Sequence, residues 1–371
     1  MKIKVALLLL LAWFAGDVFV LAGNGVFQFL DLPVSSRMAA LGGKNVSVAD
    51  YDINFALLNP ALLTNKSDNT IGLNMANYLA DIQFGTAIYG KSVGKNQFAL
   101  GVQYVDYGTF KETTEYNEII GDFTAKDISM SLIYSRMIAE GLYAGAALKP
   151  VYSVVSLTNG SYMSYGAAVD MGLSYQHPGQ LFYAGLVLRN MGTQFKGYYS
   201  DENGQHIEPL PFDIQLGVSH KLEHAPFRFS FTFHNLHDWD LRYINNLLAR
   251  MLEKFPNLHD WDLRYINNKN SQLEYDRVDV TSEIPVIDNI FRHAIIGVEF
   301  LPGKNLYLAA SYNHRRHQEL KMDGFKSMTG FSFGGGIKIS HFHVGFGTSQ
   351  FQVGNTIYMF SITTSLNDFR L

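Results

Sequence analysis

The stretch FRFSFTFH, residues 227–234, decides the fold, because its four phenylalanines alternate strictly with Arg, Ser, Thr and His. Successive side chains of a β-strand point to opposite faces, so this stretch predicts a strand with one wholly aromatic face. The same alternation recurs over 97–105, 127–138 and 357–367. Over 97–105 and 127–138 the second face is mostly Gly, Ala, Gln and Ser, whereas a water-facing sheet usually carries more Lys and Glu. This composition favours a crowded barrel interior.

Fourteen segments of this kind are expected along the chain. Lipid offers no hydrogen bonds, so a sheet that spans a membrane must close on itself. The sequence therefore predicts an all-β fold, a closed antiparallel transmembrane β-barrel of about 14 strands, in the outer membrane of a Gram-negative bacterium. The predicted strands are 70–79, 81–92, 96–107, 127–138, 142–156, 161–176, 180–191, 211–221, 226–236, 291–301, 305–316, 328–339, 342–350 and 355–366.

The predicted connections differ in length between the two ends of the barrel. Long connections are expected at 108–126, 192–210, 237–290 and 317–327, and all four leave from the same end. Outer-membrane barrels have short periplasmic turns and long outer loops. With the N-terminus in the periplasm, the long connections are predicted to face the outside.

Composition agrees with a membrane barrel. Aromatic residues make up 14% of the 371 residues, and charged residues make up 17%, below the roughly 25% that is usual in soluble domains. The longest apolar run, 5–16, is too short for a transmembrane helix, which needs about 20 residues. The sequence contains no Cys, which excludes disulfides, thiolate metal sites and a lipidated cysteine anchor.

The first part of the chain lacks the alternation. Lys2 and Lys4 precede the apolar run, and Val20-Leu21-Ala22 follows it, so residues 1–22 are predicted to be a cleaved export signal. Residues 23–69 are too apolar for a free tail and are predicted to form a plug inside the barrel, which would comprise 70–371. The alternative is an ordered cap outside the barrel.

Short helices are expected within the plug. Ser36 is predicted to cap a helix over 37–41 that Gly42-Gly43 ends. Asp52 is predicted to cap a second helix over 53–58, which the Asn59-Pro60 pair interrupts or restarts.

Charged residues on the polar faces of the strands are expected to point into the lumen, because a basic residue on the lipid side at mid-depth costs about 2–4 kcal/mol. These residues are Lys149, Asp170, Arg189, Asp213, Arg228, Glu299 and Lys338. They are predicted to pair with one another or with Arg37, Asp50 and Asp52 of the plug. The alternative, a selectivity lining for solutes, requires an open lumen.

The predicted loop 237–290 contains a duplication. The sequence NLHDWDLRYINN occurs at 235–246 and again at 257–268. Its Trp239 and Trp261 are candidates for partner contact. An amphipathic helix over 247–255 is expected to dock on a partner or to fold back on its own loop.

A basic cluster is predicted at the outer end of the strand over 305–316. Its Arg315 and Arg316 are candidates for contact with lipopolysaccharide phosphates. Ordinary interfacial residues would look the same.

The sequence motifs do not indicate a catalytic site. The two HDWD runs, 237–240 and 259–262, carry His and Asp, but neighbouring side chains of an extended chain point oppositely, so no metal site is predicted. The sequence contains no G-x-S-x-G, P-loop or dinucleotide fingerprint. The expectation is a protein without enzymatic activity, cofactor or nucleic-acid partner.

Several runs resemble one family. They are FLDLPVSSRMAALGG (29–43), NPALL (59–63), 291–325, GFSFGGGIKI (330–339) and SITTSLNDF (361–369). These runs resemble the PorV/PorQ group of the type IX secretion system of Bacteroidota, relatives of the FadL-type barrels. The resemblance implies a FadL-like barrel with an N-terminal plug. It also implies an attachment complex with PorU-like, PorV-like and PorZ-like proteins, which joins secreted proteins to anionic lipopolysaccharide.

Two function classes follow. A scaffold that anchors a PorZ-like surface protein should have a filled interior. A FadL-like channel for hydrophobic small molecules should have an apolar cavity and a break in the strand wall. A third, weaker reading is a soluble all-β protein.

Overall fold

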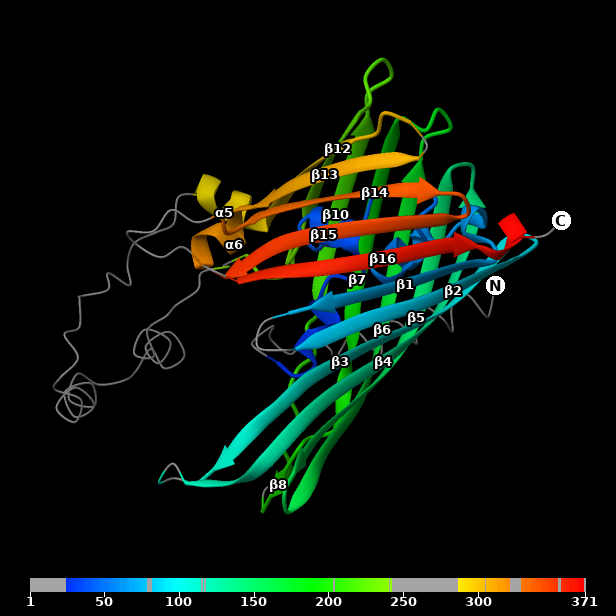
Figure 1. Ribbon diagram of the computed structural model, residues 1–371. Coiled ribbons are helices and arrows are strands. Elements are labelled where there is room, and N and C mark those ends of the chain that lie inside the picture. Colours follow the sequence, from blue (N-terminus) through cyan, green and yellow to red (C-terminus); the bar gives the residue numbers. More distant parts are fainter. Residues whose placement is uncertain are drawn as a thin grey trace.

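The computed structural model describes residues 25–78, 82–114, 116, 118–202, 204–239, 241, 286–303, 305–320, 328–352 and 355–369. Fourteen antiparallel strands close into one barrel (Figure 1), so the predicted fold class is confirmed. These strands are β1 (Thr70–Asn77), β2 (Gln83–Val93), β3 (Asn96–Thr113), β4 (Ile119–Ala139), β5 (Leu142–Leu157), β6 (Gly160–Gln176), β7 (Phe182–Lys196), β10 (Asp213–Lys221), β11 (Phe227–Phe233), β12 (Ala294–Phe300), β13 (Leu306–Asn313), β14 (Phe331–Ile339), β15 (Phe342–Gln352) and β16 (Asn355–Ser365).

Each strand pairs with its neighbours in order around the barrel, and β1 pairs with β16. The closing ladder runs from Thr70 opposite Ser365 to Asn77 opposite Tyr358. Neither of these terminal strands is therefore left with an unpaired edge, which lipid could not satisfy.

The outer surface of the barrel is an apolar belt. In β11, Phe227, Phe229 and Phe231 are 38–41% exposed, while the alternating Arg228 and Ser230 are buried. No second sheet covers these outward faces in the described part of the chain, because the other sheet there is the small hairpin of β8 (Ser200–Asp201) and β9 (Gly204–Gln205). The belt is the surface that a bilayer requires.

The two ends of the barrel differ as the sequence predicts. At one end, here called the short-turn end, the connections contain at most five residues, as in 177–181 and 222–226. The long connections 197–212, 234–293 and 314–330 all lie at the other end, here called the long-loop end.

The predicted loop 108–126 is wrong. Instead, β3 and β4 continue past the belt as a long hairpin, which projects from the long-loop end in Figure 1. Gly108, with φ of 79°, accompanies a bulge that starts this extension. Beyond it, Phe110 stacks on Phe123 at 5.1 Å between ring centroids, and Lys111 Nζ lies 2.7 Å from Asp122 Oδ1. Such cross-strand pairs stabilise a ladder whose polar composition resembles a loop.

Two strand ends are also corrected, because helices replace them. Helix α5 (Val286–His293) precedes β12, and helix α6 (His314–Glu319) follows β13. The Asn313 side chain accepts a hydrogen bond from Arg316 N at 3.0 Å, and this cap starts α6. The basic cluster that includes Arg315 therefore lies on a helix and not on a strand.

The N-terminal segment lies inside the barrel, which excludes the alternative of an outer cap. It consists of η1 (Gln28–Asp31), α2 (Ser36–Ala40), η2 (Ile53–Leu57), η3 (Pro60–Leu62) and η4 (Asn65–Ser67). Helix α2 contacts β13 to β16, η3 contacts β4 to β6, and η2 contacts β1, β2 and β4. The segment therefore touches most of the wall, and residues 25–69 are here called the plug.

Capping residues define the short helices of the plug. The cap of α2 is Ser35, whose side chain accepts from Met38 N, and not the predicted Ser36. Asp52 caps η2, as predicted, and Asn59 caps η3, which restarts at the Asn59-Pro60 pair; both helices are 3₁₀ turns. Gly42 and Gly43, with φ of 86° and 93°, end α2 in the left-handed region that glycine favours.

The predicted export signal, 1–22, lies outside the described residues, as do the duplicated copy at 257–268 and the predicted helix over 247–255. Within the described residues, the helices are all too short or too polar to cross a membrane. The C-terminal turn η6 (Leu366–Phe369) follows β16 at the short-turn end.

Leu132 tests the position of the belt. It faces outward between Leu100 and Leu148 on the neighbouring strands. We expect Leu132→Arg to lower the free energy of unfolding by about 2–4 kcal/mol, because a basic residue there meets lipid. The measurement is urea unfolding of the barrel folded into lipid vesicles. Ile120→Arg, in the projecting hairpin, is the control and should change little; an equal loss in both variants would contradict the belt.

Candidate functional site: the plugged lumen

The lumen holds a buried cluster of four charges that joins the plug to the wall. Arg37 of the plug lies 2.9 Å (Nε) from Glu299 Oε1 of β12 and 2.7 Å (Nη2) from Asp50 Oδ2. Arg228 of β11 lies 2.6 Å (Nη2) from Glu299 Oε2 and 3.2 Å (Nη2) from Asp50 Oδ2. Two guanidinium groups therefore share two carboxylates, and the cluster is neutral.

Aromatic rings surround Arg37. Its guanidinium carbon lies 4.9 Å from the ring centroid of Tyr307, and 5.5 and 5.4 Å from those of Tyr51 and Phe55. Tyr51 stacks in turn on His343 of β15 at 4.3 Å. Cation–π contacts stabilise a charge that lacks water, so this environment holds Arg37 in the interior with only 2% of its side chain exposed.

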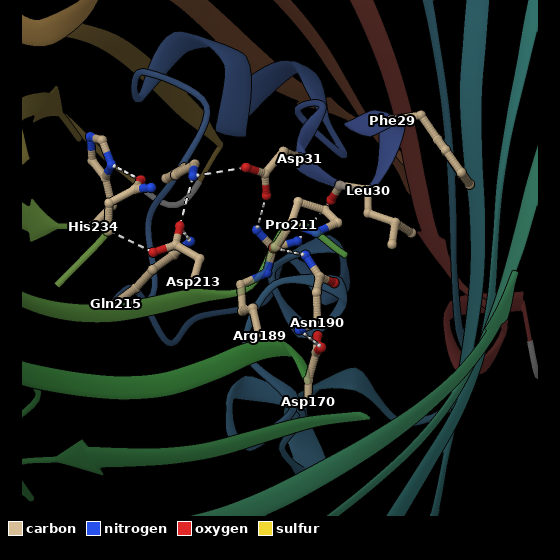
Figure 2. Close-up of polar contacts among 12 residues, drawn as sticks. Phe29, Leu30, Asp31, Asp170, Arg189, Asn190, Pro211, Asp213, Gln215 and His234 are labelled. Atoms are coloured by element: carbon tan, nitrogen blue, oxygen red, sulfur yellow. Dashed lines mark hydrogen bonds and ion pairs between the residues drawn. The ribbon is translucent and has the colours of Figure 1, made fainter. Parts of the chain in front are cut away.

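A second neutral cluster joins the plug to β7 and β10. Lys44 Nζ of the plug lies 2.7 Å from Asp213 Oδ2 and 3.2 Å from Asp31 Oδ2. Arg189 Nη1 lies 3.2 Å from Asp31 Oδ1, and its Nη2 donates to Leu30 O at 2.9 Å. Figure 2 shows Asp31 pointing toward Arg189, with Asp213 alongside.

A bulge in β7 extends this cluster to β5 and β6. Asn190, with φ of 55°, donates from its backbone N to Asp170 Oδ1 at 2.8 Å, and Asp170 also pairs with Lys149. The ladder between β6 and β7 shifts register at this point. Bulges redirect side chains, and here the bulge brings the Asn190 amide to within 2.9 Å (Nδ2) of Pro211 O.

The wall and the plug also fit closely through small residues. A Cβ added at Gly172 of β6 would lie 2.0 Å from Asn59 Oδ1, and one at Gly145 would lie 2.5 Å from the Pro60 carbonyl carbon. Asn59 Nδ2 donates to Val46 O at 3.0 Å and to Leu173 O at 3.3 Å. Asn59 and Pro60 therefore mark the place where the plug backbone packs directly on the wall.

Six of the seven charges predicted for the lumen are buried and belong to these clusters. They are Lys149, Asp170, Arg189, Asp213, Arg228 and Glu299. The seventh, Lys338, is partly exposed and lies 3.6 Å from Asp368 of the C-terminal turn. Asp52 accepts from Asn54 as a helix cap, and none of the ion pairs found in the described chain includes it.

The residues predicted for partner contact lie at the long-loop end. Trp239 is 62% exposed. Arg315 pairs with Glu319 at 2.6 Å on α6. Arg316 turns into the barrel, where its Nη1 donates to Ser349 Oγ of β15 at 2.9 Å and its Nη2 lies 3.5 Å from Gly42 O of the plug. Trp261 lies outside the described residues. The structure thus separates Arg315 from Arg316, which the sequence placed together.

Asp31, Lys44 and Asp127 also contribute buried or paired charges, although they were not among the predicted residues. Asp31 and Lys44 interrupt an apolar segment, and this signal could have indicated that they are buried partners. Asp127 is 7% exposed and accepts from Tyr107 at 2.7 Å and from Ser153. It shares the inward face of Ser129, but it stands at the predicted boundary of its strand.

The described residues contain no group of three or more His, Cys, Asp or Glu side chains that could hold a metal ion. Of the two HDWD runs, Asp240 and residues 259–262 lie outside the described part of the chain.

No protein-family model matches this chain, and no curated protein matches it at a significant level. Several solved structures are similar to this chain in fold. The toluene transporter TodX of P. putida is 11% identical with a TM-score of 0.51, over 91% of this chain and 99% of that chain. The deltaS2S3 mutant of the TodX monoaromatic hydrocarbon channel is 12% identical with a TM-score of 0.52, over 90% and 99%. At this identity the likeness shows the fold alone, a closed antiparallel barrel similar to that of TodX.

Arg37→Met tests the first cluster. It leaves two buried carboxylates beside one guanidinium, and we expect the free energy of unfolding to fall by about 3–5 kcal/mol. Adding Asp50→Asn restores neutrality and should recover part of the loss. Arg315→Met, which breaks a partly exposed pair, is the control and should cost less than about 1 kcal/mol. Equal effects of the two single substitutions, measured by urea unfolding, would refute the buried-cluster account.

Gly172→Ala tests the contact between the plug and the wall. The new methyl group collides with Asn59, so we expect a loss of about 1–3 kcal/mol in the free energy of unfolding. Gly160→Ala, where a Cβ meets nothing within 4 Å, is the matched control. The contact is disproved if limited proteolysis and urea unfolding give the same result for both variants.

Proposed function

We propose that this chain is a non-enzymatic outer-membrane barrel that anchors a surface protein complex of a Gram-negative bacterium. One observation carries the proposal: the lumen is filled by a plug that two neutral clusters of buried charges fix to the wall. A scaffold is expected to have a filled interior, whereas a channel needs an open apolar cavity, so the filled lumen favours a scaffold.

Two further features support the anchor. The ladder of hydrogen bonds is closed around the barrel, so the described strands present no break in the wall. At the long-loop end, helices α5 and α6 and the extended hairpin of β3 and β4 offer a surface to a partner.

The PorV/PorQ resemblance supplies a candidate for that partner. It suggests a PorZ-like surface protein, held beside PorU-like and PorV-like proteins during the attachment of secreted proteins to lipopolysaccharide. This membership of a type IX attachment complex stays a prediction.

The second candidate is a channel for hydrophobic small molecules, and the comparisons favour it over the type IX scaffold. TodX is described as a toluene transporter and a monoaromatic hydrocarbon channel, and its fold covers most of this chain. In this reading the plug would have to shift to open a path along the wall.

Two measurements on the full chain decide between the candidates. If the chain is an anchor, purification from native outer membranes should recover type IX components in stoichiometric amounts. A variant that lacks 242–285 should lose them while it keeps a folded, heat-modifiable barrel. In the second measurement, vesicles that contain the purified barrel should take up toluene no faster than protein-free vesicles, and the Gly172→Ala variant should behave in the same way.

The channel is favoured by the opposite pattern. Toluene uptake above that of protein-free vesicles, altered by the Gly172→Ala change in the plug contact, together with the absence of co-purified surface proteins, would reject the anchor.

A further inference from the structure

Helix α5 displays an apolar face at the long-loop end. Val286, Ile287, Ile290 and Phe291 are 43–69% exposed. They are spaced i, i+1, i+4 and i+5, so they lie on one side of the helix. Exposed apolar side chains in isolation are normal, but four on one helical face mark a contact surface.

Other residues of α5 attach the helix to the end of the barrel. His293 is buried; its Nδ1 lies 2.8 Å from His234 O, and its ring stacks on Trp239 at 5.6 Å. Asn289 Nδ2 donates to Trp239 O at 2.6 Å. Asn289 and His293 thus attach the helix to the barrel end, while the apolar side chains next to them stay exposed.

A second set of contacts joins α5 to α6. Asp288 Oδ1 of α5 lies 2.7 Å from His314 Nε2 of α6. Within α5, the Asp288 carboxylate also accepts a hydrogen bond from Arg292 Nε at 2.8 Å. Helix α6 is itself attached to the interior through Arg316 and its contact with Ser349. The two helices therefore form one unit, which Figure 1 shows at the ends of β12 to β14.

The apolar face of α5 is continuous with the belt. Phe331 of β14 lies 4.8 Å from Tyr312 of β13, Tyr312 lies 6.1 Å from His314, and His314 lies 6.0 Å from Phe291, between ring centroids. Phe331 stacks in turn on Phe333 of the same outward face. A row of aromatic contacts thus runs from the lipid-facing wall to the exposed side of α5.

We propose that α5 is an interfacial helix, whose apolar face lies in the outer-leaflet lipid at the boundary between head groups and acyl chains. Amphipathic helices bury such faces about 5–10 Å into this boundary. The continuity with the belt identifies lipid as the occupant. The contacts of Asn289, His293 and Asp288 hold the helix in this position. Because β12 follows α5 directly, the helix also fixes the depth at which β12 enters the membrane.

The lack of native cysteine allows a direct test. Ile287→Cys, labelled with the environment-sensitive fluorophore NBD and reconstituted in phosphatidylethanolamine–phosphatidylglycerol vesicles, should show a blue-shifted emission. It should also show strong quenching by spin-labelled lipid and weak quenching by iodide. Val286→Cys on the same face is a second position and should behave alike. Tyr116→Cys, at the tip of the projecting hairpin and 86% exposed, is the water-exposed control.

The inference rests on the membrane location in the proposed function, and a fourth labelled position separates failure of the interfacial helix from failure of the membrane location. Leu132→Cys in the belt should be shielded from iodide if the barrel is in the bilayer. Shielding at Leu132 with free iodide access at both Ile287 and Val286 would overturn the interfacial helix alone, and would indicate a protein as the occupant. Iodide access at Leu132 as well would overturn the membrane location itself.

Discussion

The eight-residue ladder between Thr70–Asn77 and the last strand is the constraint on which the structure depends. Without it, β1 and β16 would expose unpaired N–H and C=O groups to hydrocarbon, where each costs several kcal/mol. The closed ladder allows every strand to place apolar residues outward. It also creates an interior that must be filled or hydrated.

The interior is filled by charge as well as by apolar packing. Arg37, Lys44, Asp31 and Asp50 bring four plug charges to wall residues of the opposite sign, and both clusters sum to zero. Buried ion pairs add little stability relative to apolar residues, but breaking one is expensive. The clusters therefore select one position of the plug in the barrel more than they raise its stability.

The order and the faces of the strands could be predicted because lipid imposes a strict period on them. The inward position of Arg228 and Glu299 follows from alternation with Phe229 and Val298. The extended hairpin of β3 and β4 and the helices α5 and α6 could not be predicted, because beyond the belt there is no lipid to require the alternation. There, the secondary structure depends on local helix caps such as Asn313 and on cross-strand pairs such as Phe110 with Phe123.

The plug residues that pair with the wall were only partly accessible from sequence for the same reason. Arg37 and Asp50 stand out as charges in an apolar segment, yet nothing in a linear pattern states which wall charge each meets. Lys44 meets Asp213 across 169 positions of the chain. Such pairing depends on how the segment turns at Gly42 and Gly43, which is a property of the folded plug.

The backbone N of Ser36 donates to Ser361 Oγ at 2.8 Å, so helix α2 of the plug is joined to strand β16 across 325 positions. Contacts of such high sequence separation form late, because the intervening loop must close before they gain anything. The hydrogen bond between Ser36 and Ser361 can form only once β16 is in place. The plug therefore makes its full set of contacts no earlier than the C-terminal strand joins the barrel.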